Sequence, residues 1–309
     1  MKGISARMAR SALVFAAALL AMTETVALTI KNIQSPAALI YSPDRSVQTT
    51  GRVRVWHDGY SGSFGIVFTE TSFAPAPGTA SQKLSYGLYV PDTAPTYRLS
   101  LTGNPSAASE MIVGYFPPPS ETKKPYVDAG FAVIVSPATM PAAGTYTATI
   151  RADLYHSGYP VTGAPVDSLS FSVVVTVPSI ADLSIVPKGS AFSVSSTNAT
   201  LSFGVMSAGS SRDVDLLVRS NVRYSVSLSS SSGGALREAT SGETIPYALT
   251  SNGVPLVLSA GSAGYAALNA DPTFGVPKVY ALSVTIGAFS RLPMEGTYTD
   301  VITVNVLGP

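Results

Sequence analysis

The sequence contains no cysteine, only one tryptophan and two histidines, and Asp, Glu, Lys and Arg make up only 12% of its 309 residues. Without cysteine no disulfide can form, so the fold must be held together by burial of apolar side chains. Two histidines without any cysteine are too few for a zinc site, and the scattered aspartates form no recognisable acid–base pair. The sequence has no phosphate-binding glycine loop and no Gly-x-Ser-x-Gly turn. We therefore expect no enzyme activity, no cofactor and no bound metal.

An excess of charge of either sign is also missing. The chain has 19 Lys and Arg against 18 Asp and Glu. A nearly neutral chain has no basic surface for the phosphates of nucleic acid. We expect no nucleic-acid partner.

The longest apolar run lies close to the N-terminus. MKGISARMAR carries Lys2, Arg7 and Arg10 without an acidic residue, SALVFAAALLAM comes next, and small residues surround Ala27. This order is typical of a secretory signal peptide, and the apolar run is shorter than the ~20 residues that span a bilayer. We predict that residues 1–27 are a signal peptide and that the chain is exported through the periplasm.

The rest of the chain consists of short strand-like runs. Apolar and polar residues alternate over stretches that are bounded by Gly, Pro, Ser and Thr, and no stretch has a helical period with caps. The remaining length exceeds that of a usual single domain. We predict an all-β protein with two tandem β-sandwich domains, residues 28–178 and 179–309.

Two related halves support this division. GTYTATI at 144–150 has its counterpart in GTYTDVI at 296–302, and SYGL at 85–88 has its counterpart in PYAL at 246–249. These matches occur in the same order in both halves, so they indicate an internal repeat.

The halves differ after the Gly-Thr-Tyr strand. The first half returns as an alternating strand at 168–178, whereas the second half has no such run after its strand. We predict that the second sandwich lacks its C-terminal strand, which leaves a groove over its core and an unpaired backbone edge. A strand from another chain can fill such a groove, and the alternative is closure by one of the domain's own N-terminal strands. The predicted groove edge consists of Tyr298, Ile302, Val304 and Val306.

The second half resembles the spore coat protein U-like domain that archaic chaperone–usher pili use as a pilin. The resemblance rests on LSFG at 201–204, PYAL at 246–249 and EGTYTD at 295–300. It implies an immunoglobulin-like sandwich that receives a donor strand from the next pilin subunit. Because the first domain begins directly after the signal, without a donor segment, the chain resembles a tip adhesin. The implied partners are a periplasmic chaperone, an outer-membrane usher, the next pilin subunit and an abiotic or host surface, with a place at the pilus tip and in biofilm formation.

The order of strands in the first domain predicts where that surface would be contacted. Alternating strand directions place four loops at the end far from the second domain, at 57–62, 90–96, 116–127 and 156–167. Apolar and aromatic side chains on loop tips suit adsorption to hydrophobic surfaces, although the same rings could fold back to cap the sandwich. The predicted surface-binding residues are Tyr60, Phe116, Pro117, Pro118, Tyr126 and Tyr159.

Two other functions fit the same sequence. An all-β chain with an unpaired edge can multimerise edge to edge, as a self-associating coat or extracellular matrix protein does. A polysaccharide-binding β-sandwich is the third possibility.

Overall fold

A computed structural model describes residues 27–75, 84–91, 97–118, 125–137, 140–258 and 268–308. The predicted signal peptide lies outside these ranges except for Ala27. The described chain is all-β, as predicted, and a short 3₁₀ turn, η1 (Ala108–Glu110), is the only helical element in these ranges. Membrane-spanning helices are therefore not found in the described part of the chain.

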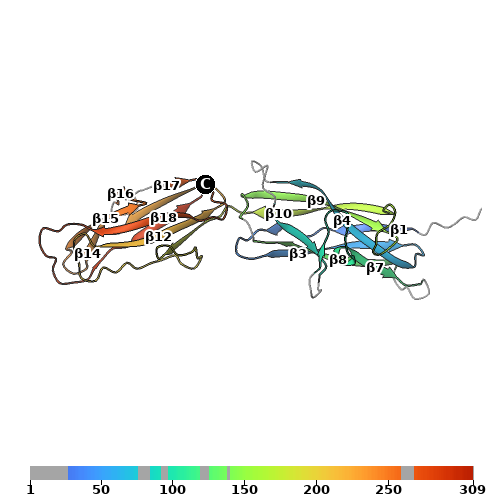
Figure 1. Ribbon diagram of the computed structural model, residues 1–309, viewed down its shortest axis with the longest axis horizontal. Helices are drawn as coiled ribbons and strands as arrows, with labels where there is room; N and C mark the ends of the chain where they lie inside the picture. Colours follow the sequence, from blue (N-terminus) through green and yellow to red (C-terminus); the bar gives the residue numbers. More distant parts are fainter. Residues whose placement is uncertain are drawn as a thin grey trace, which may run out of the picture.

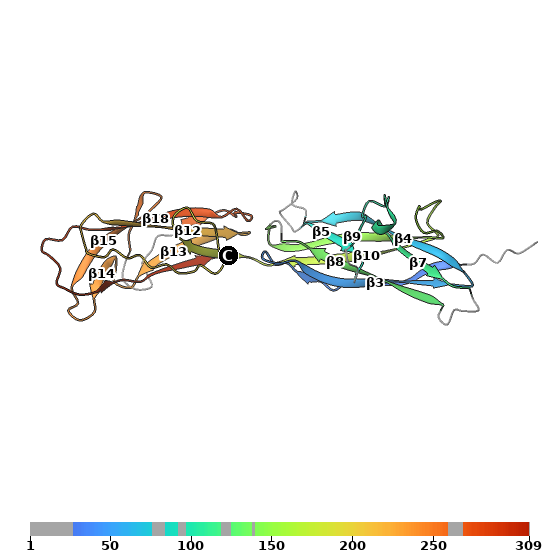
Figure 2. The same ribbon diagram turned by 60° about the horizontal axis from the view of Figure 1, so that its bottom comes forward.

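The first sandwich consists of two five-stranded sheets that face each other (Figures 1 and 2). One sheet has the order β1-β3-β8-β5-β6, with bounds Leu28–Gln34, Val47–His57, Tyr126–Val135, Tyr86–Tyr89 and Arg98–Leu99. The other has the order β2-β10-β9-β4-β7, with bounds Leu39–Ile40, Asp167–Val177, Gly144–Tyr155, Gly62–Ala74 and Ile112–Phe116.

The closing strand of the first sandwich, β10, is paired along both edges. It pairs antiparallel with β9 from Asp167 opposite Leu154 to Val177 opposite Gly144, and parallel with the short strand β2. Because it covers the core, the inward side chains of β9 are almost inaccessible: Tyr146 is 1% exposed and Ile150 0%. The alternation of apolar and polar residues predicted for residues 168–178 is the one that β10 shows in the structure.

The second sandwich is built from a large and a small sheet. The large sheet has the order β11-β12-β18-β15-β14-β19, with bounds Ala181–Val186, Ser211–Ser220, Lys278–Ile286, Thr244–Ser251, Ala235–Glu238 and Tyr298–Thr299, and β16 (Val254–Leu256) also pairs with β15. The small sheet has the order β17-β13-β20, with bounds Leu268–Ala270, Tyr224–Ser230 and Ile302–Leu307. At the centre of the core of the second sandwich lie four fully buried residues, Leu216, Val218, Val226 and Leu228.

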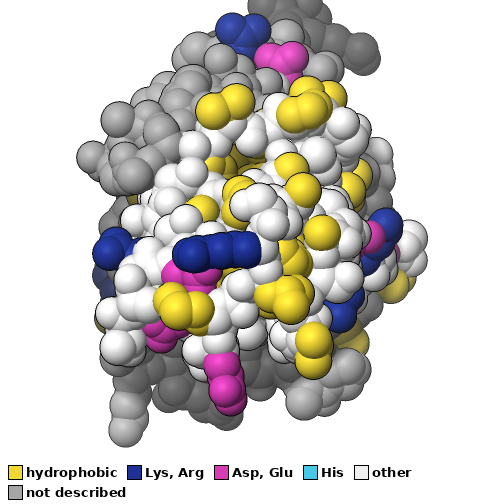
Figure 3. All heavy atoms as spheres, turned by 90° about the vertical axis from the view of Figure 1, so that its left-hand side faces the viewer, with side chains coloured by type: hydrophobic (Ala, Val, Ile, Leu, Met, Phe, Trp, Pro, Cys, Tyr) yellow, Lys and Arg dark blue, Asp and Glu magenta, His cyan; other side chains and the backbone are white. Residues whose placement is uncertain are grey.

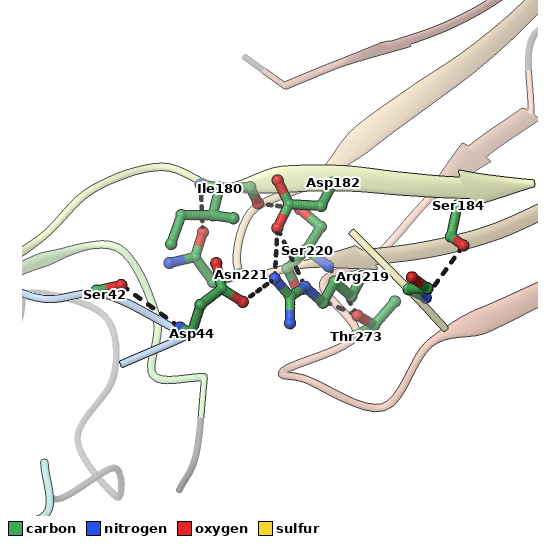
Figure 4. A network of polar contacts seen from close by, with 10 residues as sticks. Ser42, Asp44, Ile180, Asp182, Ser184, Arg219, Ser220, Asn221 and Thr273 are labelled. Atoms are coloured by element: carbon green, nitrogen blue, oxygen red, sulfur yellow. Dashed lines mark hydrogen bonds and ion pairs between the residues drawn. The ribbon is translucent and has the colours of Figure 1, made fainter. Parts of the chain in front are cut away.

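The two sandwiches lie end to end and meet at a polar junction (Figures 1 and 4). Arg219 at the end of β12 contacts Asp44 of the first sandwich at 2.7 Å and Asp182 of β11 at 2.9 Å. Asn221, which is 3% exposed, donates from Nδ2 to the carbonyl oxygens of Pro141 and Pro178 at 3.0 and 2.9 Å. Asn221 Oδ1 also accepts from the Ile180 N–H of the second sandwich at 2.8 Å, so one buried side chain bonds to both sandwiches and fixes how they meet.

Candidate functional site

The uncovered edge of β20 is the first candidate site. This strand pairs antiparallel with β13, from Ser225 opposite Leu307 to Ser230 opposite Ile302, and its second edge pairs with no other strand in the described ranges. Its counterpart in the first sandwich, β9, has β10 on the corresponding edge. An open edge of this kind presents backbone N–H and C=O groups that another strand can pair with.

The core beside this edge is only partly covered. Ile302, Val304 and Val306 point toward the core of the second sandwich but remain half-buried, while Thr303 and Asn305 between them are exposed. The equivalent inward residues of β9 are fully buried under β10. Ile302, Val304 and Val306 therefore form an apolar strip that is partly accessible along β20.

The segment Leu201-Ser202-Phe203 also packs against the core of the second sandwich. Leu201 and Phe203 are half-buried against the core, whereas Ser202 is exposed, and the segment pairs with no strand of the described chain. Arg212 holds it in place, because its guanidinium lies 5.6 Å from the Phe203 ring and donates to the Ser202 carbonyl at 2.9 Å. In the first sandwich the corresponding segment is β2, which pairs with the closing strand.

Tyr298 does not belong to the groove edge, so the prediction that placed it there is wrong. The sequence suggested one continuous strand through the Gly-Thr-Tyr motif, but the chain changes sheets after Thr299. Tyr298 pairs with Glu238 of β14 in the large sheet, and its hydroxyl donates to Glu243 Oε2 at 2.5 Å. This hydrogen bond raises the pKa of Tyr298 to about 12. Tyr298 therefore anchors the loop before the last strand.

Asp300 occupies the point where the chain changes sheets. Its carboxylate accepts hydrogen bonds from the hydroxyls of Ser230 at 2.5 Å, Ser231 at 2.6 Å and Tyr247 at 2.5 Å. Partial burial by itself raises the pKa of Asp300, but these hydroxyl donors outweigh it and hold the pKa below its usual value. The aspartate of the motif thus ties the beginning of β20 to β13 and β15.

The far end of the first sandwich is the second candidate site, and here the prediction for Phe116 is wrong. Phe116 is 0% exposed, because it is the last residue of β7 and points into the core. Its ring centroid lies 4.2 Å from that of His57 and 5.1 Å from that of Phe64. A buried ring of this kind caps the core and cannot contact a surface outside the protein.

Tyr60 also supports the structure of this end. Its ring packs at 5.1 Å from His156, and its hydroxyl lies 2.5 Å from the Ser63 carbonyl oxygen and 2.6 Å from that of His156. Burial raises the pKa of this hydroxyl. The contacts bring the loops 57–62 and 156–167 together, as predicted.

The remaining predicted surface residues lie in different settings. Pro118 and Tyr159 are exposed, and Pro117 is half-buried. Tyr126 is half-buried on the outer face of its sheet, where it stacks on Trp56 and where Arg54 lies 4.2 Å from its ring centroid. Tyr126 therefore does not share a loop tip with Tyr159.

Only the first two residues of the predicted distal loop 90–96 are described, and the strand before it stops short of this end. Tyr89, at the end of β5, pairs with Ala132, which lies midway along β8. Residues 92–96 are outside the described ranges. Strand directions alone could not reveal that β5 is short and ends midway along its neighbour.

Val113 and Tyr115 on β7 are exposed apolar residues that were not predicted from the sequence. They are 46% and 59% exposed. β7 is an edge strand that pairs only with β4 among the described strands. Tyr159 is 45% exposed, and a Cβ on its neighbour Gly158 would lie 3.2 Å from Val113. The alternating pattern of Ile112–Phe116 contained this information, because residues 113 and 115 must face away from 116.

His57 is buried at 6% exposure, and no group of three potential metal-ligating side chains occurs among the described residues.

Comparisons with known proteins give similar architectures at low identity. No protein-family model matches the chain, and no curated protein matches it. The resemblance to the spore coat protein U-like domain thus stays a prediction.

Several solved structures are similar. One is the CsuC–CsuE chaperone–tip adhesion subunit pre-assembly complex from archaic chaperone–usher Csu pili of Acinetobacter baumannii. The two sequences are 14% identical, the match covers 89% of this chain and 99% of the other, and the TM-score is 0.45. The CupB6 tip adhesin of Pseudomonas aeruginosa has 11% identity, coverages of 88% and 93%, and a TM-score of 0.35. CfaE, the adhesive subunit of CFA/I fimbria of enterotoxigenic Escherichia coli, has 10% identity, coverages of 92% and 87%, and a TM-score of 0.28. Similarities of this size do not transfer a function to this chain.

Proposed function

We propose that this chain is a pilus tip subunit with two domains, 28–178 and 179–309, and that its second domain is completed by a strand from another chain. One observation carries the proposal: β20 has an uncovered edge and a partly exposed apolar face, whereas β9 in the same setting is covered by β10. Full burial of a Val or Ile side chain is worth ~1.5–3 kcal/mol, so the partly exposed Ile302, Val304 and Val306 together leave at most about 3 kcal/mol to be gained. The inserted strand adds the burial of its own side chains.

The incoming strand would lie between β20 and the Leu201–Phe203 segment. The first sandwich supplies the template, because β10 lies between β9 and β2. In the periplasm a chaperone would occupy this position, and after passage through the usher the next pilin subunit would take it. The similar tip-adhesin structures do not decide this point.

The first sandwich would then contact the surface to which the pilus attaches. Its exposed apolar residues at the far end are Val113, Tyr115 and Tyr159, together with the exposed Pro118. Aromatic and aliphatic side chains of this kind adsorb to hydrophobic surfaces without a specific partner.

A synthetic peptide tests strand addition. Its sequence is that of residues 168–178, SLSFSVVVTVP, which is the strand that closes the first sandwich. The control peptide carries Ser in place of Phe171, Val173 and Val175, which point into the core of the first sandwich. A ligand at 100 times its Kd stabilises by about 2.7 kcal/mol, so we expect the peptide to raise the unfolding temperature of the second sandwich by roughly 5 °C or more.

The backbone amides of residues 302–307 should also exchange with solvent more slowly in the presence of the peptide. A monomeric chain whose unfolding temperature and amide exchange ignore the peptide would refute the proposal. Filaments formed by the purified chain alone would instead support the self-associating coat protein.

The polysaccharide-binding alternative has one observation in its favour. Trp56 and Tyr126 lie with ring centroids 6.3 Å apart and planes at 14° on the outer face of their sheet. Trp56 is the only tryptophan of the chain, so a soluble polysaccharide that changes the tryptophan fluorescence would favour this function, and an unchanged spectrum would count against it.

A further inference from the structure

The end of the second sandwich that points away from the first carries exposed apolar side chains (Figure 3). We call Val205, Leu292, Met294 and Val301 the pole patch, and their exposed fractions are 95%, 87%, 52% and 65%. They lie at one end because Ser211, where β12 begins, pairs with Thr285 near the end of β18, and Ile302, which follows Val301, pairs with Ser230 at the end of β13. Viewed from this end, hydrophobic side chains lie across the face among basic and acidic ones.

The loop that carries Leu292 and Met294 is held in place by Glu243. Glu243 contacts Arg291 Nη2 at 3.3 Å and accepts hydrogen bonds from the Met294 N–H at 2.9 Å and from the Tyr298 hydroxyl. The Glu243 side chain is only 12% exposed. Leu292 therefore lies between two tethered residues, and its exposure is a property of an ordered loop.

The direction of the inserted strand decides which of its two ends lies near the pole patch. β10 runs antiparallel to β9 and parallel to β2. A strand that pairs with β20 in the same sense enters beside Leu307, near the junction, and leaves beside Ile302, near the pole patch. The junction end is already occupied by the first sandwich, through the bonds of Asn221 to Pro141 and Pro178.

We infer that the pole patch is the docking surface for the folded body of the subunit that supplies the strand. This inference rests on the proposed function and extends it from the groove to a second contact with the same partner. The partner should present apolar side chains directly after the C-terminal end of its inserted strand. Burial of Leu292 and Met294 would add affinity that a peptide without a folded body cannot supply.

Photo-crosslinking in cells that produce the chain tests the inference. A benzophenone amino acid is placed at Val304 in the groove, at Leu292 in the pole patch, or at Val276, which is 76% exposed and belongs to neither. We expect positions 304 and 292 to capture the same protein, identified by mass spectrometry, and position 276 to capture none. Capture at 304 without capture of that protein at 292 overturns the inference, whereas no capture at 304 refutes the proposed function itself.

Substitutions supply an independent readout. The double variant Leu292→Ser with Met294→Ser should lower the amount of this chain in isolated fibres about fivefold, because it removes two apolar side chains from the proposed interface. Val276→Ser should leave that amount unchanged, and both purified variants should bind the 168–178 peptide within about twofold of the unsubstituted chain. Unchanged incorporation of the double variant, or an equal loss in Val276→Ser, overturns the inference. So does a loss of peptide binding in the double variant, because the patch would then act through the groove.

Discussion

At the residue scale, Tyr115 and Phe116 show how one position decides between surface and core. They are neighbours in β7, yet Tyr115 is 59% exposed and Phe116 is 0% exposed. Successive side chains of a strand point to opposite faces, so a shift of one residue exchanges the two roles. The sequence placed the end of the strand too early and therefore assigned the surface role to the wrong aromatic residue.

This difference predicts opposite effects of two substitutions. Phe116→Ala should lower the free energy of unfolding by about 3–5 kcal/mol because it leaves a cavity among His57 and Phe64, whereas Tyr115→Ser should change it by less than about 1 kcal/mol. Urea unfolding measures both. Tyr115→Ser should weaken adsorption to polystyrene, while the control Tyr97→Ser, at a 42% exposed position elsewhere, should not. A stable Phe116→Ala protein, or equal adsorption of the two Tyr variants, would contradict these assignments.

At the scale of elements, the terminal Gly-Thr-Tyr strand is divided between two sheets. Tyr298 and Thr299 pair with β14, and Ile302–Leu307 pairs with β13. Asp300 stabilises this change of sheets, because its carboxylate accepts hydrogen bonds from the hydroxyls of Ser230, Ser231 and Tyr247 where the chain crosses over. The repeat in the sequence showed that the two Gly-Thr-Tyr strands are related, but not that the second one changes partners.

Asp300 predicts a pH dependence of stability. Its pKa in the folded chain lies below the ordinary value of 3.8, so the folded state binds this proton less readily than the unfolded state does. The stabilisation is therefore fully present above about pH 4 and is lost as the pH falls through the lowered pKa. The unfolding temperature of the unsubstituted chain should fall more steeply below pH 4 than that of Asp300→Asn. Parallel curves for the two proteins would show that the carboxylate does not contribute in this way.

At the scale of the whole molecule, the junction makes the two sandwiches a single elongated body. The ion pair of Arg219 with Asp44 is partly solvent-exposed and hence weakened by salt. The hydrogen bonds of Asn221 are buried and fully formed. Load applied at the far end of the first sandwich would be carried through these contacts to β12 and β13.

The absence of cysteine allows this junction to be measured directly. Labels on cysteines introduced at Val113 and Val205, both exposed, report the distance between the far ends of the two sandwiches. Asn221→Ala should broaden the distance distribution and lower the stability by about 1–3 kcal/mol, because buried polar groups lose their partners. The control Asp213→Asn, which removes an exposed pair with Lys188 and alters a hydrogen bond with Ser283, both far from the junction, should leave the distribution narrow. Equal widths in both variants would mean that Asn221 does not fix the junction.

The all-β fold class could be read from local patterns in the sequence, whereas the open edge at residues 302–306 stays a proposal. Alternation of polar and apolar residues and the frequent turn residues are local signals, so they predicted the strands, the two related halves and the inward face of Ile302, Val304 and Val306. Tertiary structure alone decided what depends on contacts between distant segments: the burial of Phe116 against His57, the pairing of Tyr298 with β14, the exposure of Val113 beside Gly158 and the junction at Asn221. These contacts join residues far apart in the chain, and sequence periodicity carries no information about which strand a given edge will meet.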